Sequence, residues 1–449
     1  MEKLLYKNLS VNDKGHLCFA GLDTIELAQE YGTPLMLLDE PGIREQCRLY
    51  VDAVNAHFAP GSSVAFASKA LSTVATNQIM HQENMRIDVA SIGELYTAYV
   101  AGYDMDKVYF HSNTKSDDEI KYALAHKIGY FMVDNFEELE CLNEIAGRNR
   151  IKQKIFLRIT PGVKVDTLAQ ITTGTSDSKF GVAIPTGQAE QFVKKALEMR
   201  NIEVCGYHCH IGSQIFDAKP YLKTAEIMLR FSADMKKKTG YEAPELILGG
   251  GFGVRYVESQ PNMEYVDTIE KMAFHIVKIA SELNLEIPRI GLEPGRSIMA
   301  QNGMTIYTVG SVKEIPGVIN HVIVDGGMAD NPRFALYRSP YTVLLANRMN
   351  EYANFKANIV GKACESGDII QEGVIIPKPV RGDRLTVLCT GAYNFAMASN
   401  YNRIGRPPVI GISGSGFTYP IIKRETLDDL IKNDNGIPFL TRNDVRDIQ

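Results

Sequence analysis

The chain has 449 residues, of which 45% are hydrophobic, and it carries 48 basic against 53 acidic side chains. This length predicts more than one domain, and the net charge of −5, without a basic cluster, argues against a nucleic-acid-binding protein. No apolar run approaches the roughly 20 residues that cross a bilayer, and the first residues lack the features of a signal peptide. Seven cysteines without CxxC pairs indicate free thiols, so we expect a cytoplasmic protein with no membrane partner.

The first 38 residues contain short extended runs at 16–19 and 35–38 and no helix long enough to stand alone. We expect these strands to pair with strands elsewhere in the chain. Apolar residues at helical spacing follow over 40–58, and Pro60-Gly61 ends that pattern.

Strand-like runs then alternate with helical stretches. The runs lie at 64–67, 87–90, 108–111, 130–134, 155–159, 204–210, 246–248 and 290–293. Among the helices, 93–102 is amphipathic, Ser116 with Glu119 predicts a capped start, and 136–147 is acidic at its beginning. Eight strands interleaved with helices predict a closed parallel (β/α)8 barrel over residues 39–296. An open doubly wound sheet is the alternative, but no early phosphate fingerprint supports it.

The pattern changes after residue 296 to β-rich segments separated by Gly, Pro and Asn. These segments lie at 304–312, 321–325, 357–362, 384–388 and 409–412, and a polar helix with a tail follows from Thr426. They predict a second, mostly antiparallel β domain over 297–449, which the N-terminal strands of residues 1–38 complete.

Lys69 ends the first strand of the predicted barrel, in the segment VAFASKA. In a barrel of this type the carboxyl ends of the strands surround the active site, although a lysine is more often a plain surface residue. Other strands also end on polar side chains, namely Asp88, His111 with Asn113, Arg158, His210 and Glu293. A set of polar groups around one rim is what an active site on this fold requires.

Two segments near the last strands are candidates for binding a phosphate. Gly249, Gly250, Gly251 and Gly253 follow the seventh strand, and Glu293-Pro294-Gly295-Arg296 follows the eighth. Barrels commonly bind phosphate at these loops, and glycine lets backbone amides approach an anion, although a tight turn alone is the alternative for the glycines. The spacing matches neither a dinucleotide fingerprint nor a Walker loop.

A phosphorylated cofactor beside a lysine suggests pyridoxal phosphate, whose aldehyde condenses with a lysine amine. Glu293 would then pair with the pyridine nitrogen, and His210 would lie on the ring, unless it is a core histidine. Cys205, Cys209, His208 and His210 alternate along a strand and cannot form one ligand set, so we predict no metal site.

Several segments together resemble the diaminopimelate decarboxylase family. They are ASKA around Lys69, SKFG at 178–181, HCHIGSQ at 208–214, GGGFG, EPGRS, DGGMADNPRFALY at 325–337, CESGD at 364–368 and GAYNFAMASNYN at 391–402. The family belongs to the fold-type III group, with an alanine-racemase-like barrel and a C-terminal β domain. The resemblance therefore implies the same architecture as the pattern of strands.

The resemblance implies decarboxylation of meso-2,6-diaminopimelate to L-lysine and CO2 by a homodimer with composite active sites. Lys69 would hold the cofactor and Cys364 would donate a proton to the substrate. The implied cofactor-binding residues are Lys69, His210, Ser213, Gly250, Gly251, Glu293, Pro294, Gly295, Arg296 and Tyr393. The implied substrate-binding residues are Arg296, Arg333, Tyr337, Glu365 and Tyr393.

The chain departs from the usual family pattern at two places, the run Val165 to Gln170 and the residues Arg338-Ser339-Pro340 after Tyr337. Alternatives therefore stay open: a decarboxylase of ornithine, arginine or a D-amino acid on the same fold, or a catalytically silent cofactor-binding regulator. Arg333 argues against simple diamine-type substrates, because they have no distal carboxylate for a guanidinium to bind. Glu293 argues against a racemase, which would weaken the electron sink of the ring.

Overall fold

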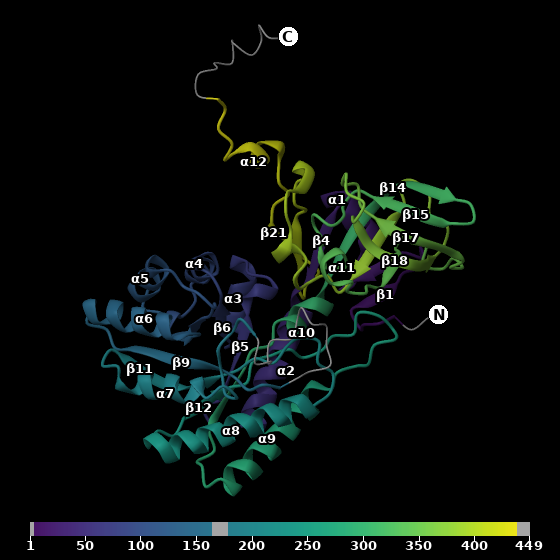
Figure 1. Ribbon diagram of the computed structural model, residues 1–449. Coiled ribbons are helices and arrows are strands. Elements are labelled where there is room, and N and C mark those ends of the chain that lie inside the picture. Colours follow the sequence, from purple (N-terminus) through teal and green to yellow (C-terminus); the bar gives the residue numbers. More distant parts are fainter. Residues whose placement is uncertain (1–3, 164–177, 438–449) are drawn as a thin grey trace.

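Eight parallel strands close into a barrel (Figure 1) in the computed structural model, which describes residues 4–163 and 178–437. The strands are β5 (Ser63–Ala67), β6 (Arg86–Val89), β7 (Val108–Phe110), β8 (Tyr130–Val133), β9 (Gln153–Thr160), β11 (Ile202–His208), β12 (Glu245–Ile247) and β13 (Arg289–Leu292). Each pairs in parallel with its neighbour, and β13 pairs with β5, so the ring is closed. The predicted barrel is confirmed, and the open sheet is excluded. A two-residue strand that was not predicted, β10 (Val182–Ala183), adds to β9.

Helices follow the strands and cover the outside of the barrel (Figure 1). They are α2 (Glu40–His57), α3 (Val74–Gln82), α4 (Ile92–Val100), α5 (Asp117–Ala125), α6 (Phe136–Arg148), α7 (Gln188–Glu198), α8 (Lys219–Thr239) and α9 (Tyr265–Glu282). The predicted start of α5 is confirmed, because Ser116 and Glu119 form a reciprocal capping box.

Side chains fill the interior of the barrel directly below its carboxyl rim. One buried cluster consists of Ala65, Tyr109, Met132, Phe156 and Ile247. Alternate residues of a strand share a face, so the residues two positions later, among them Ala67, His111 and Arg158, point the same way at the rim. The barrel is therefore packed inside and leaves room for a site only at its end.

A nine-stranded sheet forms the second domain (Figure 1). Its strands are β4 (Leu35–Asp39), β14 (Gly303–Ile315), β15 (Ile319–Val324), β16 (Val343–Leu345), β17 (Phe355–Val360), β18 (Ile369–Ile376), β19 (Arg384–Leu388), β20 (Val409–Ile412) and β21 (Thr418–Ile422). Pairing is mostly antiparallel, as predicted, and β4 lies between β14 and β20. The N-terminal run 35–38 thus completes this sheet.

The remaining N-terminal strands behave differently from the prediction. Strands β1 (Leu9–Val11), β2 (Leu17–Phe19) and β3 (Leu22–Asp23) pair only with one another in a small antiparallel sheet, which packs on the second domain. Helix α1 (Thr24–Tyr31) follows, with the Asp23 side chain as its cap, and its eight residues agree with the expectation that no helix in this region is long enough to stand alone. A helix of two turns is marginal alone, and burial of its apolar residues against the sheet stabilises it.

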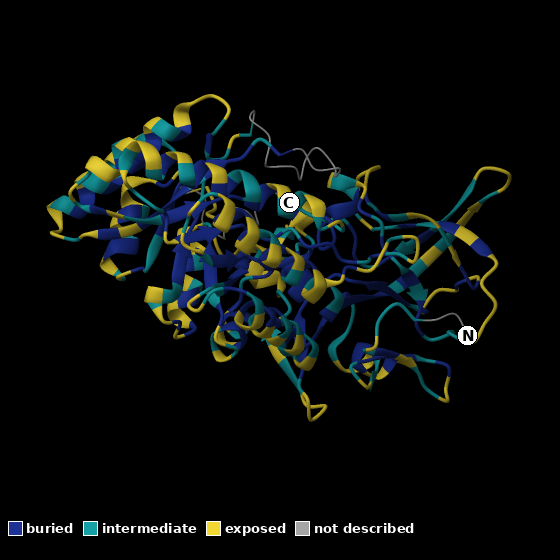
Figure 2. Ribbon diagram, turned by 90° about the horizontal axis from the view of Figure 1, so that it is seen from below, coloured by how far each residue is buried: buried dark blue, intermediate teal, exposed yellow. Residues whose placement is uncertain are grey.

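Buried residues gather in the strands of both domains, and exposed residues lie on the outer faces of the helices and in loops (Figure 2). Three other short α-helices lie among the described residues. Helix α10 (Arg296–Met299) leads from the barrel towards β14, and α11 (Arg333–Tyr337) follows β15. Helix α12 (Leu427–Ile431) begins after Thr426, as predicted. No helix within the described ranges is long and apolar enough to cross a membrane.

Candidate active site

A cavity of about 650 Å³ opens at the carboxyl ends of the barrel strands, where the second domain faces the barrel. From the barrel it is lined by Lys69, Asp88, His111, Arg158, His208, His210, Ser213, Gly251, Tyr256, Glu293, Gly295 and Arg296, among others. From the second domain it is lined by Arg333, Tyr337, Arg338, Ser339, Pro340, Tyr393 and Met397. The two domains therefore build one site.

Lys69 lies in a single 3-10 turn, Ser68–Ala70, directly after β5. Its neighbours Ser68 and Ala70 are buried, whereas the Lys69 side chain is exposed to the cavity. The backbone N–H of Tyr393 donates to the carbonyl of Ala70 at 2.8 Å, so the second domain holds the lysine turn in place. Lys69 therefore reaches the cavity from a well-anchored backbone.

Glu293 is buried at the end of β13, where two histidines hold its carboxylate. The Nε2–H of His111 donates to one oxygen at 3.1 Å, and the Nε2–H of His208 donates to the other at 3.0 Å. Burial favours a neutral carboxyl, but His208 and His111 outweigh it and hold the pKa of Glu293 well below its usual range. The site thus contains a buried carboxylate that stays anionic.

Asp88, on β6, which β5 separates from β13, has a pKa shifted in the opposite direction. Its carboxylate lies 3.9 Å from Nε2 of His111, and burial raises its pKa to about 6. The atoms of His111, His208 and Glu293 lie within 4.8 Å of one another and would also suit a metal ion. This is not the cysteine–histidine set considered from the sequence, and the absence of a resident metal stays a prediction.

His210 and the glycine loop form the wall beside Lys69. The backbone N–H of Gly250 donates to Nδ1 of His210 at 3.3 Å, and burial, with Lys69 and Arg158 nearby, lowers the pKa of His210 well below its usual value. A Cβ on Gly250 would lie 2.0 Å from the carbonyl oxygen of Glu293. Glycine is required there because the loops after β12 and β13 touch through their backbones.

Arg296 is buried in the short helix α10, with 8% of its surface exposed. Its Nε and Nη2 donate to the hydroxyl of Ser213 at 3.1 and 3.0 Å, and its Nη1 donates to the hydroxyl of Tyr256 at 3.0 Å. The guanidinium carbon lies 4.7 Å from the ring centre of Tyr393. All of these contacts are with neutral groups.

Arg333, in α11, is also buried, with 4% of its surface exposed. It donates to the hydroxyls of Tyr341 at 2.8 Å and Ser339 at 3.1 Å. Within residues 4–163 and 178–437, neither Arg296 nor Arg333 forms an ion pair with a carboxylate. A buried guanidinium without a counter-ion is costly, so both arginines indicate that the cavity receives anionic groups.

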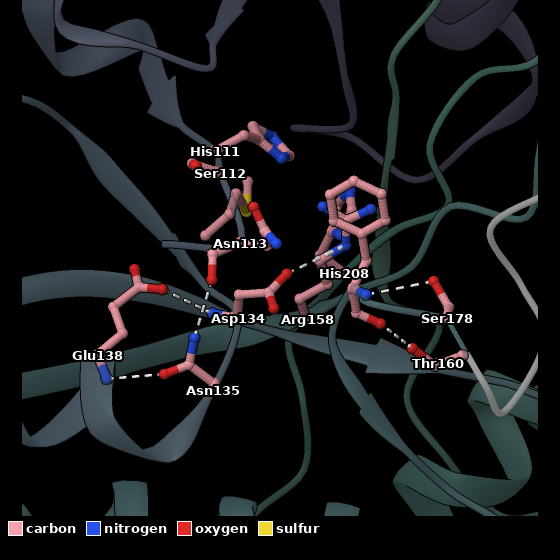
Figure 3. Close-up of polar contacts among 12 residues, drawn as sticks. His111, Ser112, Asn113, Asp134, Asn135, Glu138, Arg158, Thr160, Ser178 and His208 are labelled. Atoms are coloured by element: carbon pink, nitrogen blue, oxygen red, sulfur yellow. Dashed lines mark hydrogen bonds and ion pairs between the residues drawn. The ribbon is translucent and has the colours of Figure 1, made fainter. Parts of the chain in front are cut away.

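Figure 3 shows how the rim is braced beneath His111 and His208. Arg158 lies against Asp134, with Nε 3.8 Å from the carboxylate, and its guanidinium covers the ring of Phe180 at 4.4 Å. The Glu138 carboxylate accepts from the backbone N–H of Asp134 at 3.1 Å. It also pairs with the buried ammonium of Lys115. These contacts fix the loops that follow β7, β8 and β9.

Four of the residues implied by the resemblance, Gly250, Pro294, Cys364 and Glu365, are not among the residues that line the cavity of their own chain. Cys364 and Glu365 are exposed in the loop between β17 and β18. The Cys364 backbone donates to Asn402 at 2.6 Å, and the Glu365 carboxylate accepts from Tyr401 at 3.4 Å. Gly250 and Pro294 contribute backbone next to the cavity, and the run 165–170 lies outside the described residues.

Sequence reasoning missed several residues of the site. His208 was considered only as a metal ligand, although its position two residues before His210 in the predicted strand 204–210 could have signalled that both face the rim. The departure at Arg338-Ser339-Pro340 does line the cavity. Tyr256 and Tyr341, which hold the two arginines, carried no signal, because tyrosines in loops follow no local pattern that reveals their partners.

Comparisons with known proteins agree with this geometry. The family model described as "Pyridoxal-dependent decarboxylase, pyridoxal binding domain" matches residues 42–300. The diaminopimelate decarboxylase of Bacillus subtilis is 42% identical over 431 residues, which cover 96% of this chain and 97% of that protein. That of Mycobacterium tuberculosis is 35% identical over 95% of this chain and 96% of its own length.

Solved structures extend the comparison to the fold. The crystal structure of diaminopimelate decarboxylase from M. jannaschii in complex with L-lysine matches with a TM-score of 0.87 at 32% identity, covering 97% of this chain and 99% of that one. The Helicobacter pylori enzyme, also complexed with L-lysine, matches with a TM-score of 0.83 at 29% identity over 91% and 98% of the two chains. The chain belongs to the diaminopimelate decarboxylase family of pyridoxal-dependent decarboxylases.

Proposed function

We propose that this chain decarboxylates meso-2,6-diaminopimelate to L-lysine and CO2 with pyridoxal phosphate as its cofactor. One observation carries the proposal: a single cavity joins a lysine and an anionic glutamate at the barrel rim to two buried arginines that have only neutral partners. This arrangement suits a cofactor with an aldehyde, a ring nitrogen and a phosphate, together with a substrate that carries a second carboxylate.

The residues present fit pyridoxal phosphate. Lys69 would bind its aldehyde carbon, Glu293 its ring nitrogen, and His210 would lie against its ring. Donors for the phosphate come from the Ser213 hydroxyl, the Arg296 guanidinium, the Tyr393 side chain and the backbone around Gly250, Gly251, Pro294 and Gly295. A Cβ at Gly251 would lie 2.2 Å from the carbonyl of Gly212, so the loops already meet as closely as a phosphate cradle requires.

Pyridoxal phosphate supplies an electron sink for the pair of electrons left on the substrate Cα when CO2 departs. Glu293 would hold a proton on the ring nitrogen, a role for which an anionic carboxylate clamped by His111 and His208 is suited. Lys69 would bind the cofactor between turnovers and release it to the substrate amine. The cavity wall between the barrel and the second domain would hold the substrate away from bulk water.

Arg333 would bind the distal carboxylate of the substrate. Tyr337, and Glu365 from the second protomer of a dimer, would lie beside that carboxylate. Arg296 would lie at the end of the site that holds the cofactor phosphate. The hydroxyls of Ser339 and Tyr341 fix the guanidinium before any substrate arrives. A planar, preorganised guanidinium binds a carboxylate through two hydrogen bonds. An ornithine or lysine substrate has no carboxylate at that end and could not form them.

We also propose a two-fold homodimer in which Cys364 of one protomer donates the proton to Cα in the other. The exposure of Cys364 and Glu365 outside their own cavity supports this assembly. Residues 39–296 would carry the cofactor, and residues 297–449 with strands from 1–38 would supply the substrate-binding groups. All seven cysteines are free, which suits an enzyme of the cytoplasm.

The substitution Arg333→Ala tests the substrate assignment. Loss of a charge-assisted contact costs about 2 kcal/mol, so we expect KM for meso-diaminopimelate to rise about 30-fold in steady-state assays, while the visible spectrum of the bound cofactor stays unchanged. Arg333→Lys should recover only part of the loss, because an ammonium cannot form the paired contact. Arg230→Ala, on the exposed face of α8, is the matched control. An unchanged KM in the Arg333→Ala enzyme would refute the assignment.

A further inference from the structure

Tyr256 lines the cavity, but the proposed chemistry gives this residue no role. It lies in the loop between β12 and α9, with only 1% of its surface exposed. Its backbone N–H donates to Gln260 at 2.7 Å, and its carbonyl accepts from the hydroxyl of Thr342, in the second domain, at 2.9 Å. Residues of both domains therefore hold the Tyr256 backbone in place.

The ring and the hydroxyl of Tyr256 contact two different arginines. Nη1 of Arg296 donates to the Tyr256 hydroxyl at 3.0 Å, and the guanidinium carbon of Arg333 lies 5.0 Å from the ring centre. The ring of Tyr341 packs edge-on against Tyr256 at 5.5 Å and holds Arg333 through its own hydroxyl. The electron-rich face and the hydroxyl oxygen of one phenol thus stabilise two buried positive charges.

The other hydrogen-bond partners of the two arginines do not overlap. Arg296 donates to the Ser213 hydroxyl of the barrel and also lies against the ring of Tyr393 from the second domain, whereas Arg333 donates to Ser339 and Tyr341 of the second domain. Within the described parts of the chain no carboxylate pairs with either guanidinium, so each is available to one anion. Tyr256 contacts both guanidinium groups.

We propose that Tyr256 is a positioning residue that holds Arg296 and Arg333 as two distinct anion subsites, the first for the cofactor phosphate and the second for the distal carboxylate of the substrate. The inference rests on the proposed function for the identity of the two anions. The Arg296 guanidinium carbon also lies 6.0 Å from the ring centre, but of the two arginines only Arg296 bonds to the Tyr256 hydroxyl, so removal of the hydroxyl alone separates the two roles.

Tyr256→Phe removes the hydroxyl and keeps the ring. Nη1 of Arg296 loses its acceptor, so we expect the dissociation constant of pyridoxal phosphate, measured by its visible absorption on rebinding to resolved enzyme, to rise about fivefold. KM for meso-diaminopimelate should stay within about twofold of wild type, because Arg333 keeps its aromatic face. Tyr256→Leu removes both contacts and should raise KM about tenfold as well, and raise the inhibition constant of pimelate in parallel.

Tyr265→Phe is the matched control, because Tyr265 is a largely buried tyrosine nearby whose hydroxyl donates to Gly253 and which contacts neither arginine. A purely structural role would give Tyr256→Phe and Tyr265→Phe the same cofactor affinity, and would make Tyr256→Leu lose kcat and thermal stability without a selective rise in KM. Either result would overturn the proposal. If wild type fails to turn over meso-diaminopimelate, the proposed function falls, and the comparison of cofactor affinities still decides whether Tyr256 positions Arg296.

Discussion

Enzyme carrying Lys69→Ala should lose both the visible absorption band of lysine-bound pyridoxal phosphate and all detectable decarboxylation. Among the described residues that line the cavity, Lys69 is the only lysine, so no other side-chain amine is placed to bind the aldehyde. The loss follows from covalent chemistry that no neighbouring group can replace. Absorption spectra of the purified protein with added cofactor, and CO2 release from meso-diaminopimelate, measure the two effects.

In the same experiment, Lys69→Arg tests whether the positive charge of Lys69 is sufficient or whether its amine is required. It keeps a cation beside His210 but presents no amine that condenses readily with an aldehyde, so it should be as inactive as the alanine variant. Lys271→Ala, on the exposed face of α9, should behave like wild type. A Lys69→Ala protein that keeps the absorption band would show that another amine holds the cofactor.

Mixing the two inactive variants Lys69→Ala and Cys364→Ala should restore activity. In the proposed dimer each site combines Lys69 of one protomer with Cys364 of the other, so a mixed dimer has one doubly damaged site and one intact site. Random pairing makes about half of the dimers mixed, and the activity should approach roughly a quarter of wild type. The exposed position of Cys364, with its backbone bonded to Asn402, motivates this design.

Subunit exchange must be verified independently in this experiment, by size exclusion or by mass spectrometry of differently tagged chains. A mixture of Cys364→Ala with Cys364→Ser protein is the control, because no pairing of those chains contains an intact site. If exchange is complete and the mixture of Lys69→Ala with Cys364→Ala stays inactive, Cys364 does not act across an interface.

The barrel could be predicted from the sequence because its strands carry their signal locally. A parallel strand covered on both faces is a short continuous apolar run, and the run at 64–67 became β5, Ser63–Ala67. Helix α1 could not be predicted in this way. Its eight residues are too few for a periodic pattern, and its stability comes from packing in a cluster that joins the nearby strands β2 and β4 to β14, β19 and β20, which lie hundreds of residues away.

The candidate site was predictable to the extent that strand ends converge on one rim. That rule placed Lys69, His210 and Glu293 together without knowledge of the fold. The histidine clamp on Glu293 and the contacts of Tyr256 with Arg296 and Arg333 depend on loops and on the meeting of two domains. Such contacts join residues far apart in the chain, and no local pattern encodes them.

The most direct test of the account is the product formed from meso-diaminopimelate in D2O. The enzyme with pyridoxal phosphate should release one CO2 for each substrate consumed, and the product should be L-lysine with one deuterium on the carbon that lost the carboxylate, as measured by mass spectrometry and NMR. Under the same conditions, the enzyme should release little CO2 from L-lysine, L-ornithine or L-arginine. Recovery of undecarboxylated diaminopimelate with deuterium at Cα, or faster CO2 release from ornithine or arginine, would contradict the account.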